Sequence, residues 1–270
     1  MPADSPELPA KDLRTLIPEY AGLARTATLL NPEPGDPGVR ESSLGGELLW
    51  PADEPWPYCA QEDHWTFGSD PRNRTEIVPG AVPMVPILQL YARDVPELEF
   101  PPGKDLLQLV WCALVHEQDQ GPVVPRLYWR NAAEIMAAGP LSEIPGVREG
   151  EYDEDNMPEP STLSPKMAED YPSRHDLPQD MWETWETRFR SSAGGTGAVW
   201  PPDSNVIATK VGGWPAWTQP SDWPECESGH RMEHLLTITG DIQLGDCGGV
   251  YFFHCRRCPG LPWDWRFDCH

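Results

Sequence analysis

The sequence contains little cysteine, with seven residues among 270. An odd number at this low density is unlike a disulfide-stabilised secreted scaffold. No apolar run approaches the roughly 20 residues that a bilayer-spanning helix needs. The acidic, proline-rich start of the chain also lacks the basic and apolar regions of a signal peptide. These absences predict a cytoplasmic protein whose thiols are reduced or bound to metal.

Basic residues are scarce as well. The chain has 20 Lys and Arg against 43 Asp and Glu, which gives a formal net charge of -23. A polyanion of this strength is repelled by phosphate backbones and by anionic lipid headgroups, so nucleic acid and membrane partners are not expected. A basic protein or peptide partner is compatible with the charge. The alternative is that the charge only maintains solubility.

Recognisable catalytic motifs are missing from the sequence. It contains no Gly-x-Ser-x-Gly elbow, no His-Glu-x-x-His pattern and no kinase signature. The Gly-Gly pairs at 45–46 and 212–213 invite a phosphate-binding interpretation, but neither belongs to a Gly-x-Gly-x-x-Gly or Gly-Lys-Ser loop that would hold a phosphate. We therefore assign no catalytic residue and do not expect an enzyme.

Tryptophan, proline and glycine are abundant. Trp occurs 13 times, more often than Phe or Tyr, while Pro occurs 33 times and Gly 23 times. Frequent proline and glycine favour many short strands and turns over long helices. The large aromatic side chains then supply core material, because each buries roughly 150–250 Å².

An internal repeat is the most informative feature of the sequence. Residues 42–59 align without a gap onto residues 209–226, with six identical positions: a Gly pair, two Trp, one Pro and the final Cys. Trp and Cys are rare, so agreement at three such positions is improbable by chance. In each copy two further apolar stretches follow, and the second ends in Cys. These stretches are 84–90 and 107–112 in the first copy, and 232–238 and 250–255 in the second.

The apolar stretches are rich in Val, Tyr, Phe and Trp, which favours strands. We expect a β-rich α+β fold, an internally duplicated antiparallel-sheet module with a short N-terminal helical segment. The predicted parts are the helical segment at 1–38, the first copy at 39–130, an acidic insertion or linker at 131–200, and the second copy at 201–270. Apolar spacing predicts short helices within 9–30, broken around Pro18, and another helix near 180–188.

The second copy resembles the bacterial YwqG-like family, which is similar to the eukaryotic programmed-cell-death-2 and ribosome-assembly chaperone proteins. Four stretches carry the resemblance: 209–217, which contains Gly-Gly-Trp-Pro-Ala-Trp; Trp-Pro-Glu-Cys at 223–226; 232–238; and 245–255, which ends in Phe-Phe-His-Cys. The resemblance implies a duplicated β-rich fold and a protein-binding role, chaperone-like or toxin-neutralising, without enzymatic activity. Many relatives carry Cys-x-x-Cys after the Trp-Pro step, whereas here the second Cys position is Ser228.

The best candidate metal site combines two short-spaced ligand pairs in the second copy. Cys226 and His230 form one pair, and Cys255 and Cys258 form the other. Thiolate and imidazole ligands at such spacings suit tetrahedral Zn²⁺, and four protein ligands leave no position for water. We expect a structural zinc site here. Small buried thiols and a surface histidine would give the same pattern, so that alternative stays open.

The repeat predicts a second, weaker metal site in the first copy. Its four residues are Cys59, His64, Cys112 and His116, which correspond in this order to the four candidate ligands of the second copy. The alternative is stronger at this site, because Cys112 lies in the apolar run 106–114, where a core thiol is the ordinary occupant.

Three functional hypotheses follow from the sequence. The first is a non-enzymatic protein-binding module of the YwqG-like type, in which acidic loops and an aromatic groove engage a basic or extended protein segment. Trp214 is its candidate binding residue because it does not recur in the first copy; the tryptophans that do recur are expected in the core. The alternatives are a metal-assisted hydrolase with an open zinc position and a small-molecule sensor that uses the cleft between the two copies.

Overall fold

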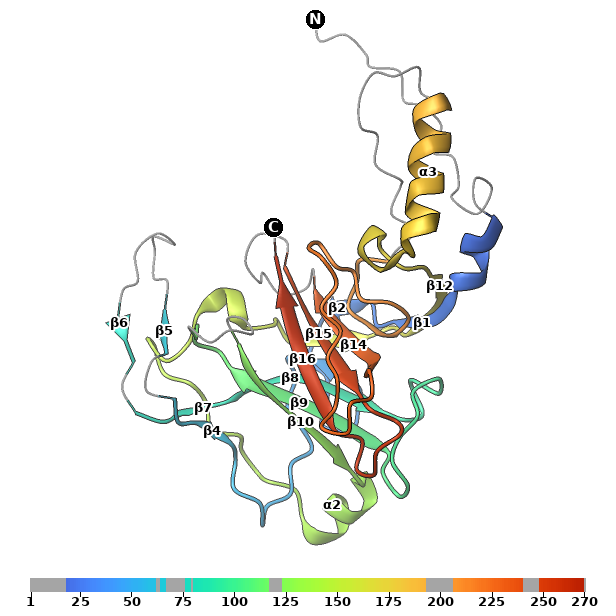
Figure 1. The fold of residues 1–270 in the computed structure, drawn as a ribbon. Coiled ribbons are helices and arrows are strands. Elements are labelled where there is room, and N and C mark those ends of the chain that lie inside the picture. The colour runs from blue at the N-terminus through green and yellow to red at the C-terminus, as the bar shows by residue number, and fades with distance from the viewer. Residues whose placement is uncertain are drawn as a thin grey trace, which may run out of the picture.

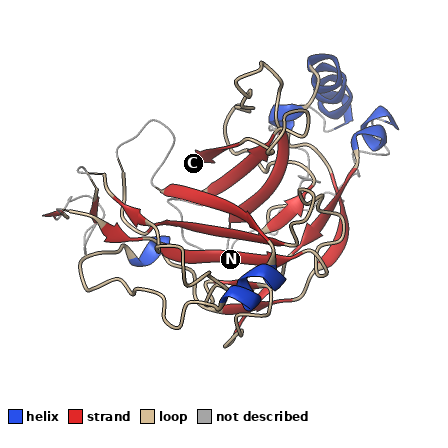
Figure 2. Cartoon of the chain, turned by 90° about the horizontal axis from the view of Figure 1, so that it is seen from below, coloured by secondary structure: helices blue, strands red, loops and turns tan. Residues whose placement is uncertain are grey.

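Two antiparallel sheets of six strands each form the body of the fold. The computed structural model describes residues 18–61, 64–66, 76–78, 80–116, 123–192, 206–239 and 248–269. The sheets share an apolar core, and the short helices lie at their margins (Figure 1 and Figure 2). Within the described residues, no helix has the length and apolar character needed to cross a membrane.

The first sheet contains the strands of the first copy. In spatial order its strands are β10 (Val124–Arg130), β9 (Leu106–Cys112), β8 (Val85–Tyr91), β3 (Ser43–Leu44), β11 (Ser161–Leu163) and β2 (Pro32–Pro34). Two additional strand pairs belong to this part of the chain. They are β4 (Tyr58–Cys59) with β7 (Val82–Pro83), and β5 (Trp65–Thr66) with β6 (Glu76–Ile77).

The second sheet contains the strands of the second copy. In spatial order its strands are β12 (Lys166–Asp170), β1 (Arg25–Leu29), β13 (Lys210–Gly212), β14 (Glu233–Thr239), β15 (Gly249–His254) and β16 (Trp263–Asp268). The described helices are η1 (Pro18–Leu23), α2 (Ala132–Ala138), η2 (Glu154–Asn156), η3 (Arg174–Asp176) and α3 (Gln179–Ser192).

The two sheets repeat one strand order. From each Gly-Gly strand outward, β3-β8-β9-β10 in the first sheet corresponds to β13-β14-β15-β16 in the second. Even the irregularities coincide: the β8–β9 register shifts between Pro86 and Leu88, and the β14–β15 register shifts between His234 and Leu236. These are aligned positions of the two copies. The prediction of a β-rich, internally duplicated antiparallel fold is therefore confirmed.

The Gly pairs are explained by backbone geometry. Gly45 and Gly212, the first glycines of the two pairs, have φ angles of 67° and 69°, in the left-handed region that favours glycine. At Gly213 an added Cβ would lie 2.3 Å from Oδ2 of Asp170, which is far too close. Both pairs therefore serve tight turns and close packing, as expected for pairs outside a phosphate-binding motif.

The segment that precedes each copy contributes one strand to the sheet of the other copy. Strand β11, which precedes the second copy in sequence, pairs with β3 of the first sheet. Strand β1, which precedes the first copy, pairs with β13 of the second sheet. The strands that follow them, β12 and β2, close the opposite edges of the two sheets. This exchange makes each sheet dependent on chain segments from both halves.

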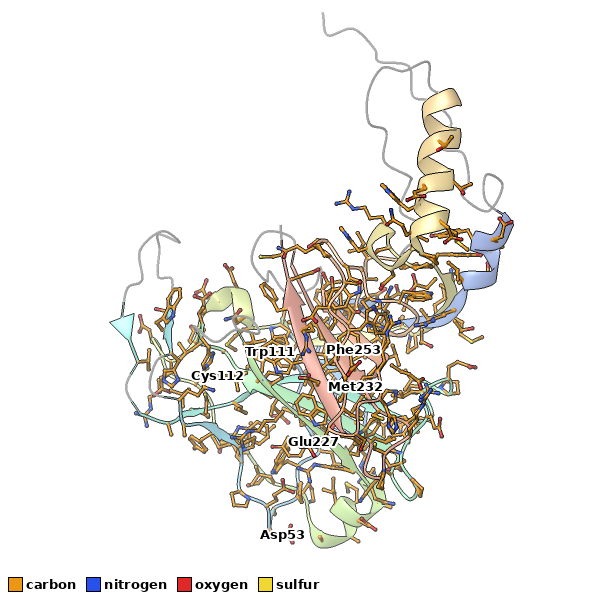
Figure 3. All side chains as sticks on the ribbon, in the orientation of Figure 1. Asp53, Trp111, Cys112, Glu227, Met232 and Phe253 are labelled. Carbon is orange, nitrogen blue, oxygen red and sulfur yellow. The ribbon has the colours of Figure 1, made fainter. Side chains whose placement is uncertain are left out.

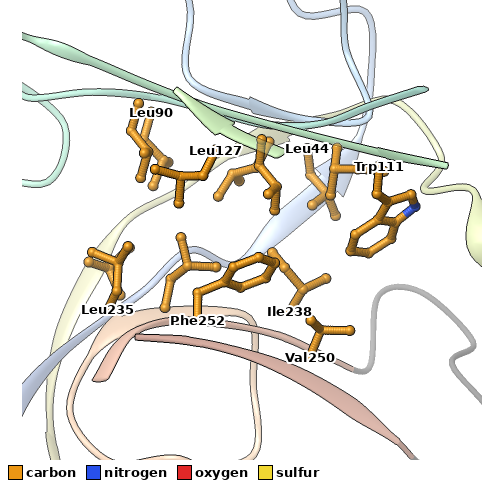
Figure 4. Packing of buried hydrophobic residues seen from close by; sticks show 14 of the residues in the cluster. Leu44, Leu90, Trp111, Leu127, Leu235, Ile238, Val250 and Phe252 are labelled. Carbon is orange, nitrogen blue, oxygen red and sulfur yellow. The ribbon is translucent and has the colours of Figure 1, made fainter. Parts of the chain in front are cut away.

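The shared core lies between the facing sides of the two sheets, as Figure 4 shows with Leu90 and Leu127 opposite Leu235 and Phe252. Strands β9 and β15 are buried on both sides along their whole length. Because side chains alternate across a strand, one side of each strand joins the shared core and the other joins a separate outer cluster. The cysteines at 112 and 255 belong to these outer clusters.

The predicted helices are only partly found. Helix α3 confirms the helix expected near 180–188. In the expected helical stretch 9–30, residues 9–17 lie outside the described residues, and a 3-10 helix occupies Pro18–Leu23. Residues Arg25–Leu29 form strand β1 instead, so that part of the prediction is wrong. β-branched Thr26 and Thr28 favour the extended conformation, and pairing on both edges stabilises it.

Candidate metal centres

A tight turn builds half of the cluster in the second copy. The backbone N–H of Cys226 donates to the carbonyl of His230 at 2.9 Å, and the N–H of Gly229 donates to the carbonyl of Cys226 at 2.8 Å. Gly229 has a φ of 73°, which a residue with a side chain would adopt only under strain. The turn therefore folds the imidazole of His230 back beside the thiol of Cys226.

The other half of this cluster follows strand β15. Cys258 Sγ lies 3.8 Å from Cys226 Sγ and 3.5 Å from His230 Nδ1, while Cys255 Sγ lies 3.6 Å from the same nitrogen. All four ligand atoms lie within 4.8 Å of one another. A tetrahedral zinc ion with ordinary bond lengths would separate two sulfurs by about 3.8 Å, and a sulfur from a nitrogen by about 3.6 Å. The predicted ligands thus come together with spacings that fit zinc.

Ser228 lies beside this cluster. The Cys258 thiol is 3.6 Å from its hydroxyl. That hydroxyl favours the thiolate, but burial and the thiols of Cys255 and Cys226 outweigh it and raise the pKa of Cys258. At Cys226, burial opposes ionisation, whereas backbone hydrogen bonds from His230 and Ser228 and the nearby thiols lower the pKa. His230, and not Ser228, is the fourth candidate ligand of the cluster.

The first copy contains the equivalent cluster, fully buried. Cys59 ends β4, Cys112 ends β9, and His64 and His116 lie in the segments that follow these strands. The four ligand atoms again lie within 4.8 Å of one another, and Cys59 Sγ is 3.4 Å from His116 Nε2. Figure 3 places Cys112 apart from Met232, which lies near the cluster of the second copy. The structure therefore brings together all eight residues predicted for the two sites.

The surroundings of His64 fit the role of a metal ligand in the first cluster. The residue is fully buried, and within the described structure neither of its ring nitrogens has a hydrogen-bond partner. Buried polar groups are normally satisfied, and leaving one without a partner costs about 1–3 kcal/mol. A metal ion bonded to one of these nitrogens would remove that cost. The donor set and this unsatisfied histidine both fit zinc.

The two thiols of the first cluster differ in how easily they ionise. A hydrogen bond from the Cys112 thiol, opposed by burial and supported by His116, lowers the pKa of Cys59. The same hydrogen bond, together with burial, raises the pKa of Cys112. Cys59 is therefore the thiol that ionises first, and binding of a cation would displace the proton of Cys112.

Trp214, the candidate binding residue, lies beside strand β1. Its indole N–H donates to the carbonyl of Leu23 at 2.9 Å, and the guanidinium of Arg25 covers its ring at 3.4 Å from the centroid. Trp214 is itself buried, like the recurring tryptophans Trp50, Trp56 and Trp217, whereas Trp223, also expected in the core, is only partly buried. The role of Trp214 in binding stays a prediction.

Two features of the second copy were not anticipated from the sequence. The first is a fully buried ion pair, in which Lys210 Nζ lies 2.6 Å from Oδ2 of Asp170. The second is a pocket bordered by arginines, which is treated below. Neither has a local sequence signal, because the residues come from strands far apart in the chain. Only the replacement of Ser43 by lysine at the aligned position 210 hints at the ion pair.

Comparison with known proteins identifies the family. A family model described as a domain of unknown function, DUF1963, matches residues 42–256. The match covers both copies of the repeat, including all eight candidate ligands except Cys258. Comparison with curated proteins gave no match. Because the matched region is most of the chain, this protein belongs to the DUF1963 family.

Proposed function

We propose that this chain is a non-enzymatic protein-binding module whose two copies each contain a structural zinc ion. The observation that carries the proposal is the closure of both clusters by four Cys or His ligands within 4.8 Å. Catalytic zinc sites have three protein ligands and keep a fourth position for water or substrate. Four converging protein ligands favour a structural role over the metal-assisted hydrolase.

Zinc would cross-link two chain segments in each copy. In each copy the ligands join the segment after the Trp-Pro step to the end of the second long strand. These segments have little regular structure, so their position depends on side-chain packing and on such links. Because an unfolded chain lacks the preformed site, the free energy of zinc binding contributes directly to folding.

The acidic segment 149–155 is the surface that we assign to a basic partner. It contains five carboxylates, and Glu149, Glu154 and Asp155 are exposed. Burial, and then the neighbouring charges of Asp153 and Glu154, raise the pKa of Asp155, as expected where like charges crowd together. A lysine- or arginine-rich segment would relieve this repulsion. The resemblance to the YwqG-like family, with its chaperone-like or toxin-neutralising relatives, supports the same role.

Metal content tests the zinc half of the proposal. Protein produced with zinc should contain two Zn²⁺ per chain, one for each cluster. Cys258→Ser should lose one equivalent, whereas Cys269→Ser, which alters a cysteine outside both clusters, should keep two. The structural role would be contradicted by metal-free wild-type protein with a native circular dichroism spectrum, or by Cys258→Ser with full zinc content.

Peptide binding tests the partner half. A labelled deca-lysine peptide should bind the zinc-loaded chain at low salt and dissociate at about 0.5 M NaCl, where charges are screened within a few ångström. Neutralising Glu149, Glu151, Glu154 and Asp155 should weaken binding more than neutralising four exposed carboxylates elsewhere, at Glu19, Glu33, Glu47 and Asp53. Equal loss in the two variants would mean that only net charge matters, and the assigned surface would be wrong.

A further inference from the structure

A pocket of about 470 Å³ lies where the second sheet meets the loop that follows β8 of the first copy. Its floor includes Gly212 and Gly213, and its apolar wall includes Leu98, Met232 and Leu235. A volume of this size is typical of sites for small molecules. The pocket thus lies between the two copies of the repeat.

Its charge is opposite to that of the whole protein. The charged residues that border the pocket are Arg25, Arg231, Arg256, Arg257, Glu97 and Glu233. Four of the chain's 20 basic residues therefore meet only two carboxylates here, in a protein with a net charge of -23. Such a local reversal of sign creates a field that attracts small anions into a surface that otherwise repels them.

Most of these arginines form no salt bridge with the acidic residues that the structure describes. Arg256 bridges Glu99 at 3.4 Å and Glu233 at 3.3 Å on the surface. Arg25, Arg231 and Arg257 form no salt bridge with any residue that the structure describes. Asp176, whose carboxylate accepts a hydrogen bond from the Trp223 indole, attracts Arg25 and Arg231 from a distance only.

Tryptophans hold two of the guanidinium groups in place. Arg231 stacks on Trp223 at 4.2 Å from the ring centroid, and Arg25 lies 3.4 Å from the centroid of Trp214 and 6.0 Å from that of Trp223. Stacking covers the faces of a guanidinium and leaves its N–H groups exposed along the edges, where one of them, Nη1 of Arg25, donates to the carbonyl of Gly213 at 3.4 Å. Such preoriented edges match the oxygens of a carboxylate or phosphate in a bidentate pair.

His254 adds an unsatisfied polar group to the pocket wall. It is 1% exposed, and its Nε2 accepts a hydrogen bond from Nε of Arg256 at 3.3 Å. The proton of the neutral ring then belongs on Nδ1, which has no partner in the described part of the chain. A buried donor without an acceptor is unusual and points to a missing acceptor group.

We propose that this pocket binds a small organic anion, a carboxylate or phosphate carried on a compact apolar body. The arginines would pair with the oxygens, while Trp223, Leu98 and Met232 would contact the apolar part. The proposal does not depend on the zinc ions or on the basic protein partner, because the pocket shares no ligand residue with the clusters and attracts the opposite charge.

Calorimetric titration of the zinc-loaded full chain tests this site. Phenyl phosphate and phthalate serve as the two anionic probes and benzyltrimethylammonium as the cationic control. At least one anion should bind saturably and more weakly as salt is added, and the tighter of the two identifies the preferred acidic group. Arg25→Gln and Arg231→Gln should each weaken binding about tenfold or more, whereas Arg148→Gln, outside the pocket, should leave it unchanged.

Several results would overturn the proposal. The proposal would be wrong if neither anion bound with a dissociation constant below about 10 mM. It would also be wrong if the cation bound as tightly as the anions, or if both pocket variants bound the anion as tightly as the wild type. Zinc content is measured before and after each titration, because Arg231 adjoins the ligand His230. Arg25 lies on β1, far from the ligands in sequence. Its variant therefore separates loss of the anion site from damage to a metal cluster.

Discussion

The two Cys/His clusters occupy equivalent places in the repeat but differ in burial and in ligand type. The first, with two cysteines and two histidines, is fully buried, whereas His230 and Cys258 of the second are partly exposed. Two thiolates neutralise Zn²⁺, while three leave one negative charge on the complex. An uncompensated charge is costly in an apolar core and tolerable beside water. The number of cysteines in each cluster thus matches the burial of that cluster. The comparison indicates that duplicated sites diverge in ligand type according to their burial.

The largest expected effect is the loss of the buried cluster. Cys112→Ala removes a candidate ligand from β9, the strand between β8 and β10, and would leave two buried histidines without the proposed metal. We expect destabilisation by more than about 4 kcal/mol, or failure to fold. Cys258→Ala, in the partly exposed cluster, should disturb only its own turn and leave most of the protein folded. Chemical denaturation of the two variants checks this difference, and equal effects would contradict it.

The next largest expected effect is the loss of stability when the Lys210–Asp170 ion pair of the second sheet is broken. Asp170→Asn leaves the ammonium of Lys210 buried without its counter-charge, although a carbonyl still accepts from it. Breaking one side of a buried pair typically costs about 3–5 kcal/mol. Lys166→Gln, an exposed change on the same strand, is the matched control and should be nearly neutral.

A double substitution sharpens this result. Asp170→Leu combined with Lys210→Met, which replaces the pair by apolar groups, should be more stable than Asp170→Asn if the unpaired charge causes the loss. Thermal unfolding of the three variants provides the comparison. A double variant less stable than Asp170→Asn would show that the backbone hydrogen bonds accepted by the carboxylate dominate instead.

The smallest expected effect is a pH dependence of stability that arises at the bulge of the second sheet and not at that of the first. His234 occupies the bulge of the second sheet where the first sheet has Pro86. Burial, and then the charges of Lys210 and Arg25, hold the pKa of His234 well below its ordinary value. The unfolded histidine binds a proton more readily than the folded one. The contribution of neutral His234 to the free energy of unfolding is therefore complete above about pH 6.5 and decreases as the pH drops below that value. The slope approaches about 1.4 kcal/mol per pH unit.

The variant His234→Gln isolates this contribution. Acid also protonates the metal ligands, so the informative quantity is the difference in unfolding free energy between wild type and variant from pH 7 to pH 5. The wild type should lose more stability over this interval than the variant. Parallel curves would mean that His234 has the same pKa in the folded and the unfolded state.

The sequence predicted the features that repeat and missed the features of single occurrence that depend on distant strand pairing. Rare residues at matching positions revealed the duplication, and the duplication located both clusters, including the weaker one around Cys59. Strand β1 was mistaken for a helix because its short apolar spacing fits both, and only its pairing with segments 137 or more residues away decides. The Lys210–Asp170 pair and the arginine pocket depend on the same distant pairing, which no local pattern reports.

The exchange of strands between the halves has a consequence for synthesis. Strand β1 is synthesised well before β13, which pairs with one of its edges. Until β13 emerges, β1 lacks its partner on that edge, and such edges attract other chains. The interval during which the nascent protein needs protection is thus set by how late β13 is translated.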